Sequence, residues 1–228
     1  MLFIGLDDTD NAESRGTGRL ARMIAEDLAR NFHLHGVIRH QLAKDAAIPM
    51  TKKNSSASIM LGTPAGFTAN GLVDRIKTLM LADFMPGSDP GLCVATAVSP
   101  DVIAFGQRAK QQIMTQEDAR HLAERSGLTL LGLGGTEDGV IGALASVGLA
   151  ASGDDGRYII VGRSREISGE LPVAEVLAAG IDVVQTPGGE MVSEGLIAID
   201  KLRPARRGGQ AVAYVEWDQG VWRHIRYE

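Results

Sequence analysis

The chain has 228 residues, and 44% of them are hydrophobic, so it can bury a substantial core. This length is typical of one large domain or two small ones. The formal net charge of −5 at pH 7 excludes a generally basic, nucleic-acid-coating protein. The single cysteine, Cys93, excludes an intrachain disulfide and a cysteine-rich zinc site.

The chain has no recognisable targeting or membrane-spanning segment. Its N-terminus lacks a basic region followed by a long apolar run, as a signal peptide would have. No stretch reaches the roughly 18 apolar residues that a membrane span requires. We therefore expect a cytoplasmic protein from a reducing compartment, with no membrane partner.

Strand-like and helix-like patterns alternate along the first half of the chain. Residues 1–6 form a short apolar run, and Leu20, Ile24 and Leu28 then recur with helical spacing. Further strands are predicted over residues 35–43, 55–61 and 91–98, and further helices over 70–84, 101–114 and 115–127. This mixture predicts an α/β or α+β fold.

The second half continues in the same way and ends differently. Strands are predicted over residues 128–135 and 157–163, and helices over 140–153 and 173–180. The basic, glycine-rich stretch 203–210 is predicted to be a loop, and residues 211–228 a hairpin with Asp-Gln-Gly at its turn. We expect three parts, over residues 1–115, 116–182 and 183–228.

Three acidic residues, Asp7, Asp8 and Asp10, follow the first strand directly. Carboxylates placed so close together repel one another unless a cation compensates them. Mg²⁺ suits this position because it takes oxygen ligands and keeps sites for water and phosphate. The alternative is a solvated turn, with Thr9 or Asp10 capping the next helix.

The start of the next helix has groups that suit an anion. Gly16 and Gly18 allow close backbone approach, Thr17 supplies a hydroxyl and Arg19 a positive charge. The alternative is an ordinary helix N-terminus capped by Thr17. Acids that suit a cation lie beside amides that suit an anion, and the two together predict binding of a metal-bound nucleotide.

Two later turns could add to this site. Lys52 and Asn54 lie in a polar turn between two strands, which can hold phosphate or can be a solvated loop. Gly134, Gly135 and Gly139 lie between a strand and a helix of small residues, and they permit close backbone approach. The alternative for these glycines is a tight turn with small-residue packing.

Three stretches, IGLDDTD, IPMTKKNSSASI and GVIGALASVG, occur in this order and resemble the archaeal tRNA-isoleucine 2-agmatinylcytidine synthetase family. The resemblance spans roughly residues 2–165 and implies a kinase-like domain joined to a ferredoxin-like domain. It implies that Asp7, Asp8 and Asp10 organise ATP with Mg²⁺. Thr17 matches the threonine that is phosphorylated in the family.

The resemblance further implies that Lys52 and Asn54 correspond to polar residues of the family's second motif. Where the family has a basic residue in its third motif, this chain has Glu137 or Asp138. We expect this chain to lack the family's oligonucleotide-binding barrel and its cysteine-rich zinc ribbon. A small-molecule acceptor is therefore favoured over tRNA.

The leading hypothesis is a Mg²⁺-dependent, ATP-using enzyme that transfers a phosphoryl group or activates an acceptor, as a kinase-like or ligase-like transferase does. In phosphoryl transfer, catalysis is mainly placement and charge neutralisation. One alternative is a nucleotide-binding or RNA-associated module without turnover. Another is a tRNA modifier that takes its RNA-binding part from a partner chain.

Overall fold

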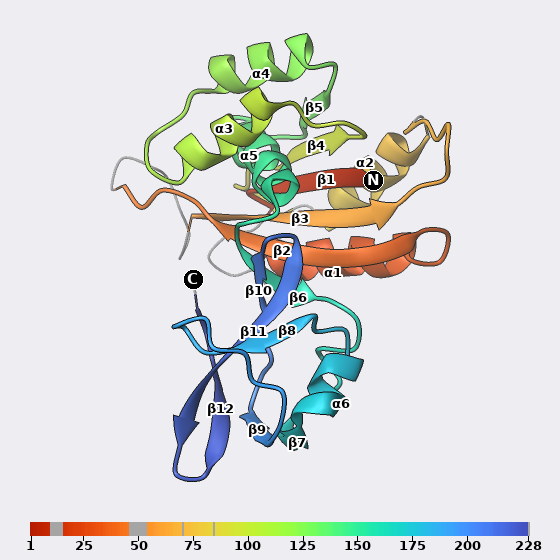
Figure 1. Ribbon diagram of the computed structural model, residues 1–228. Helices are drawn as coiled ribbons and strands as arrows, with labels where there is room; N and C mark the ends of the chain where they lie inside the picture. Colours follow the sequence, from red (N-terminus) through yellow and green to blue (C-terminus); the bar gives the residue numbers. More distant parts are fainter. Residues whose placement is uncertain (10–15, 46–53, 70, 84, 228) are drawn as a thin grey trace. The chain divides into compact units, whose positions relative to one another are not determined.

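The computed structural model describes residues 1–9, 16–45, 54–69, 71–83 and 85–227 (Figure 1). The chain forms two compact units, over residues 1–152 and 153–228. The boundaries expected after residues 115 and 182 both lie inside these units. The reason is long-range pairing, because residues 116–152 supply an edge strand and the central helix of the first unit.

The first unit is built on a five-stranded antiparallel sheet. Its strand order is β5-β4-β1-β3-β2, and β1, which carries the acidic motif, is the central strand. The bounds are β1 Leu2–Asp7, β2 His33–Gln41, β3 Ser55–Gly62, β4 Gly91–Ala95 and β5 Thr129–Gly132. An antiparallel sheet combined with helices confirms the α+β class.

Helices cover both faces of this sheet. Alternate residues of β1 point to opposite faces. Phe3 packs against the helices α3 to α5, whereas Ile4 and Leu6 are fully buried on the side where the amphipathic helix α1 contacts the sheet. The helices are α1 Thr17–Leu28, α2 Leu72–Ala82, α3 Pro100–Ala109, α4 Gln116–Arg125 and α5 Gly139–Ser152.

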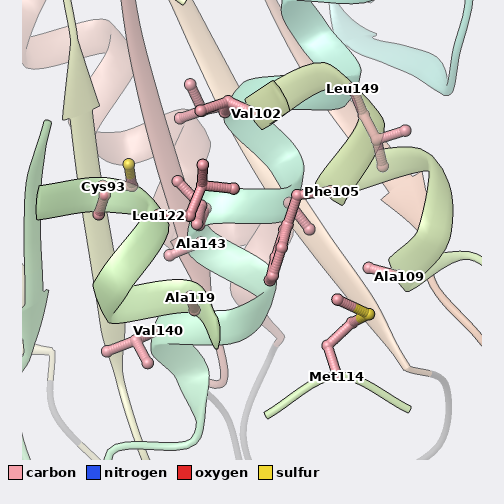
Figure 2. Close-up of a cluster of buried hydrophobic side chains, with 14 of the residues drawn as sticks. Cys93, Val102, Phe105, Ala109, Met114, Ala119, Leu122, Val140, Ala143 and Leu149 are labelled. Carbon is pink, nitrogen blue, oxygen red and sulfur yellow. The ribbon is translucent and has the colours of Figure 1, made fainter. Parts of the chain in front are cut away.

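The core between α3, α4 and α5 is apolar and closely packed (Figure 2). Phe105 of α3 and Leu149 of α5 lie within it and are almost completely buried. Gly148 lets α3 approach closely, because a Cβ atom there would overlap the backbone of Val102. The small residues of α5 thus allow this helix to be packed on all sides. Each large side chain buried in this way contributes roughly 1.5–3 kcal/mol.

The second unit is a mixed sheet of short strands with one short helix. Its strand order is β6-β10-β11-β12-β9-β7, and β8 pairs in parallel with β11. The bounds are β6 Arg157–Ile160, β7 Gly169–Pro172, β8 Val183–Gln185, β9 Leu196–Ile199, β10 Ala205–Arg207, β11 Gln210–Asp218 and β12 Val221–Ile225, with the helix α6 at Val173–Ala178.

The C-terminal hairpin is present as predicted, but the loop predicted before it is wrong in part. The β11–β12 turn has positive φ at Gln219 and Gly220, as tight hairpin turns require. Within the stretch 203–210, residues 205–207 form β10 and pair with β11 through a Gly208–Gly209 turn. Such a short strand has no periodicity that a sequence could show. None of the helices in the described part of the chain combines the length and the apolar composition that a membrane span needs.

Candidate functional site

The end of β1 places Asp7 against the first turn of α5. The side chain of Asp7 points to the α5 face of the sheet, where a Cβ atom on Gly142 would overlap its carboxylate. Gly139, the first residue of α5, packs against the backbone of Asp7 and of Gly91. The positive end of the α5 dipole therefore lies next to a half-buried carboxylate, which stabilises the negative charge.

The chain turns sharply after Asp7. Asp8 is half-buried and has a left-handed backbone with φ of 47°, a conformation in which Asp and Asn are the most tolerated side chains after glycine. Thr9 is 5% exposed, and its hydroxyl has no hydrogen-bond partner within the described structure. A buried hydroxyl without a partner costs about 1–3 kcal/mol, which is typical of a site that binds something else. Asp10 lies outside the described residues.

The start of α1 has a glycine before its first residue, and the arginine in its first turn forms an ion pair with an acidic side chain. Gly16 precedes the helix with φ of 87°, and no side chain of the described residues caps the helix there, so the alternative in which Thr17 is the cap is wrong. Thr17 itself is buried as the first helical residue, followed by Gly18. The Arg19 guanidinium donates to the Asp83 carboxylate at 3.2 Å, which offsets its charge.

The second predicted turn is described only at its end. Lys52 lies outside the described residues. The side-chain amide of Asn54 donates to the Ala43 carbonyl at 2.9 Å, and its backbone carbonyl accepts from the Leu42 N–H at 3.0 Å. Asn54 therefore joins the end of β2 to the start of β3, a structural role that leaves open the function predicted for it.

The glycine loop before α5 is occupied by a carboxylate of the same chain. Asp89, which precedes β4, accepts the Thr136 N–H with its carboxylate, and a Cβ atom on Gly135 would overlap that carboxylate. The Asp89 carbonyl accepts the Gly139 N–H at 3.0 Å. The loop that contains Gly134 and Gly135 thus holds an internal anion at the position where the sequence predicts a phosphate.

Side chains of α4 fix the same loop from the other side. Arg120 forms an ion pair with Glu137, which has a left-handed backbone with φ of 67°. Gln116 donates to the Thr136 carbonyl at 2.8 Å and to the Asp138 carboxylate at 2.6 Å. Glu137 and Asp138 are therefore part of the contact between α4 and the start of α5.

The structure brings some predicted residues together and separates the roles of others. Asp7 and Gly139 meet at the sheet–helix junction. Arg19 forms an ion pair with Asp83, and Asn54 donates a hydrogen bond to Ala43. The loop that contains Gly134 and Gly135 is occupied by the Asp89 carboxylate. Within the described ranges, which do not include Asp10, no group of three or more His, Cys, Asp and Glu residues is arranged to hold a metal ion.

Two residues near the site were not identified from the sequence. Asp89 lies in a Ser-Asp-Pro-Gly turn before a buried strand, and such turns are too common to indicate a helix-anchoring role. Ser56 lies in β3 on the same face of the sheet as Asp7, and its sequence signals are its place in the stretch IPMTKKNSSASI and a polar residue at a buried strand position. Both roles depend on contacts between distant parts of the chain.

Comparison with known proteins supports the fold. No protein-family model and no curated sequence matches the chain. Crystal structures of TiaS do match. The complex with its isoleucine tRNA and ATP matches at 22% identity and a TM-score of 0.55. The complex with the same tRNA, AMPCPP and agmatine matches at 21% identity and a TM-score of 0.54. The structure of a tRNA fluorescent labeling enzyme matches at 22% identity and a TM-score of 0.56.

These matches cover only part of each protein. Each covers 64% of this chain, but only 35% or 36% of the matched chain. TiaS is an agmatidine synthetase that acts on an isoleucine tRNA, so the resemblance noted in the three sequence motifs is confirmed in the fold. At these identities, the similarity establishes the architecture of the matched part.

Proposed function

We propose that the chain binds ATP with Mg²⁺ at the end of β1 and uses it to transfer a phosphoryl group or to activate an acceptor, with a small molecule favoured as acceptor. The observation that supports this most is the contact of the Asp7 carboxylate with the N-terminal turn of α5 at the end of the central strand, directly before Asp8. Oxygen ligands for a cation lie there beside a helix end that favours anions.

The residues at this point fit a Mg²⁺–nucleotide. The glycine at position 142 makes room for the Asp7 carboxylate, and the hydroxyl of Thr9 is buried without a partner within the described structure. Asp7 and Asp8, together with Asp10 of the same motif, would hold the metal. Bound Mg²⁺ would neutralise phosphate charge, which is the main electrostatic requirement of phosphoryl transfer.

The other named residues have supporting roles in this proposal. Thr17 would place a hydroxyl at the start of α1, and Gly16 and Gly18 would let phosphate oxygens approach the backbone. Lys52 would offset charge on the terminal phosphate. Arg19 would contribute only if its contact with Asp83 opens.

A second candidate is a nucleotide-binding module without turnover. The glycine loop before α5 is filled by Asp89, and Glu137 is paired with Arg120, so fewer groups are available for a triphosphate than the sequence suggests. A third candidate, a tRNA modifier with a partner chain, is favoured by the likeness to a chain crystallised with an isoleucine tRNA.

Ligand binding and turnover distinguish these candidates. At a Mg²⁺–ATP concentration 100 times the dissociation constant, binding stabilises the folded state by about 2.7 kcal/mol, which is a rise in Tm of roughly 5–10 °C. An enzyme additionally releases ADP or AMP when an acceptor is supplied. A tRNA modifier retains tRNA on a filter, with affinity that falls steeply as salt rises.

The decisive variant is Asp8→Asn. Asn tolerates the left-handed backbone at position 8 and matches Asp in size, so the change removes the charge and keeps the backbone conformation. We expect Asp8→Asn to abolish the Mg²⁺–ATP shift, whereas the control Asp101→Asn, at a highly exposed position of α3, keeps it. A wild-type protein that shows no shift, or an Asp8→Asn variant that shifts fully, contradicts the proposal.

A further inference from the structure

A row of residues crosses the sheet beside Asp7 on the face covered by α5. Asp7 is paired with Gly91 of β4 on one side. On the other side, Leu6 pairs with Ala57, and one further residue along this register places Ser56 of β3 beside Asp7. Ser56 is in turn paired with His40 of β2. Because paired residues of an antiparallel sheet point to the same face, the Ser56 hydroxyl lies on the same side as the Asp7 carboxylate.

Two serines of β3 on this face differ in their hydrogen bonds. Ser58 is fully buried, and its Oγ lies 2.9 Å from Nε2 of His40. Ser56 is 1% exposed, and its Oγ has no hydrogen-bond partner within the described structure. Burying a hydroxyl without a partner is unfavourable, so a protein retains one where another group uses it.

We propose that Ser56 is a binding residue of the β1 site, and that its hydroxyl forms a hydrogen bond with an oxygen of the Mg²⁺–nucleotide beside Asp7. This inference rests on the proposed function. A hydroxyl both donates and accepts, so the oxygen is either that of a metal-bound water or that of a phosphate. Ser56 differs from the acids in being uncharged, so it adds direction without adding repulsion.

The test compares Ser56→Ala with Ser58→Ala in the full chain. A structural serine and a ligand-binding serine give opposite results. Ser56→Ala removes a hydroxyl that has no partner among the described residues, so the Tm without ligand stays the same or rises. Its dissociation constant for Mg²⁺–ATP, measured by calorimetry, increases roughly tenfold, because a hydrogen bond to a charged group is lost. Ser58→Ala removes the hydroxyl that His40 contacts, so the Tm falls while the dissociation constant stays within about twofold.

Titration with Mg²⁺ alone distinguishes the two oxygen sources. If Ser56→Ala weakens Mg²⁺ binding in the absence of ATP, the partner is a metal-bound water; if it weakens only Mg²⁺–ATP, the partner is a phosphate oxygen. The inference is overturned if Ser56→Ala binds Mg²⁺–ATP as wild type does or lowers the Tm without ligand. The proposed function then still stands, because the wild-type protein binds. If wild type itself does not bind, both fail.

Discussion

The carboxylate of Asp7 lies in the space that a side chain at Gly142 would occupy. These residues are far apart in the sequence, and their contact aligns the end of the central strand with the first turn of α5. Taken separately, the two sequence motifs are explained as an acidic turn and as a small-residue helix. Their contact is what makes the acidic motif part of a site.

This contact predicts how Gly142→Ala behaves. Alanine is favoured over glycine within a helix by about 1 kcal/mol, but its methyl group would overlap the Asp7 carboxylate. We expect Gly142→Ala to lower the free energy of unfolding in the wild-type background. In an Asp7→Ala background, the same change should cost at least about 1 kcal/mol less, measured by urea denaturation as a double-mutant cycle.

Gly148→Ala is the matched control for this cycle. Its added methyl group would overlap the backbone of Val102, which Asp7→Ala does not change. Gly148→Ala should therefore destabilise both backgrounds equally. Equal costs of Gly142→Ala in the two backgrounds would mean that Asp7 does not occupy this space in solution.

How far the sequence predicts the fold depends on the length of the pattern. The helix at Thr17–Leu28 and the strand at Leu2–Asp7 have clear periodicity or apolar runs, and both are predicted. The strands at Gly169–Pro172 and Ala205–Arg207 have only three or four residues, too few for a period. The first is set by pairing with the distant β9, and the second by a tight turn to β11.

The same distinction applies to the site. The acids Asp7 and Asp8 are adjacent in the sequence, so their clustering is visible there. The occupation of the glycine loop by Asp89 is not, because 47 positions separate Asp89 from Thr136 and they meet through the antiparallel pairing of β4 with β5 and the contact of Asp89 with the start of α5. Sequence patterns show which residues could bind a ligand, whereas long-range contacts determine which of them already bind another part of the chain.

Asp89 is predicted to anchor the start of α5. Its carboxylate accepts the Thr136 N–H, much as a capping residue satisfies a helix N-terminus. Asp89→Ala should lower the free energy of unfolding by about 1–2 kcal/mol, measured by urea denaturation. Asp89→Asn retains an acceptor oxygen and should cost less than half as much. Equal costs for the two variants would show that charge, rather than the hydrogen bond, stabilises the loop.

Cys93 is predicted to be unreactive in the folded protein. It is fully buried in β4, and burial raises the pKa of its thiol to about 12, so almost no thiolate forms at neutral pH. A thiol-reactive dye should label the native protein only as fast as the first unit unfolds, and should label one equivalent at once in guanidinium chloride. Rapid labelling without denaturant would mean that β4 opens locally.

The second unit is predicted to lose stability on mild acidification through His224. The Nε2 atom of His224 accepts the Arg203 N–H at 3.0 Å, and Nδ1 lies 3.1 Å from the Tyr214 carbonyl, so the neutral ring fits this position. Burial lowers its pKa below the usual 6.5, and this outweighs the hydrogen bond with the Tyr214 carbonyl, which raises the pKa; the charges of Arg203 and Arg226 lower it further. The unfolded chain therefore binds this proton more readily than the folded one. The stabilisation is complete above pH 6.5 and is lost as the pH falls below that value.

Thermal unfolding between about pH 7.5 and pH 5 measures the loss of stability caused by protonation of His224. This range stays above roughly pH 4, where most carboxylates titrate. We expect the Tm of the wild-type protein to fall across the range and that of His224→Gln to fall less, because glutamine does not titrate. His121→Gln, a change in the exposed part of α4, is the control and should follow wild type. A His224→Gln variant with the wild-type slope would contradict the assignment, because the proton uptake would then belong to another group.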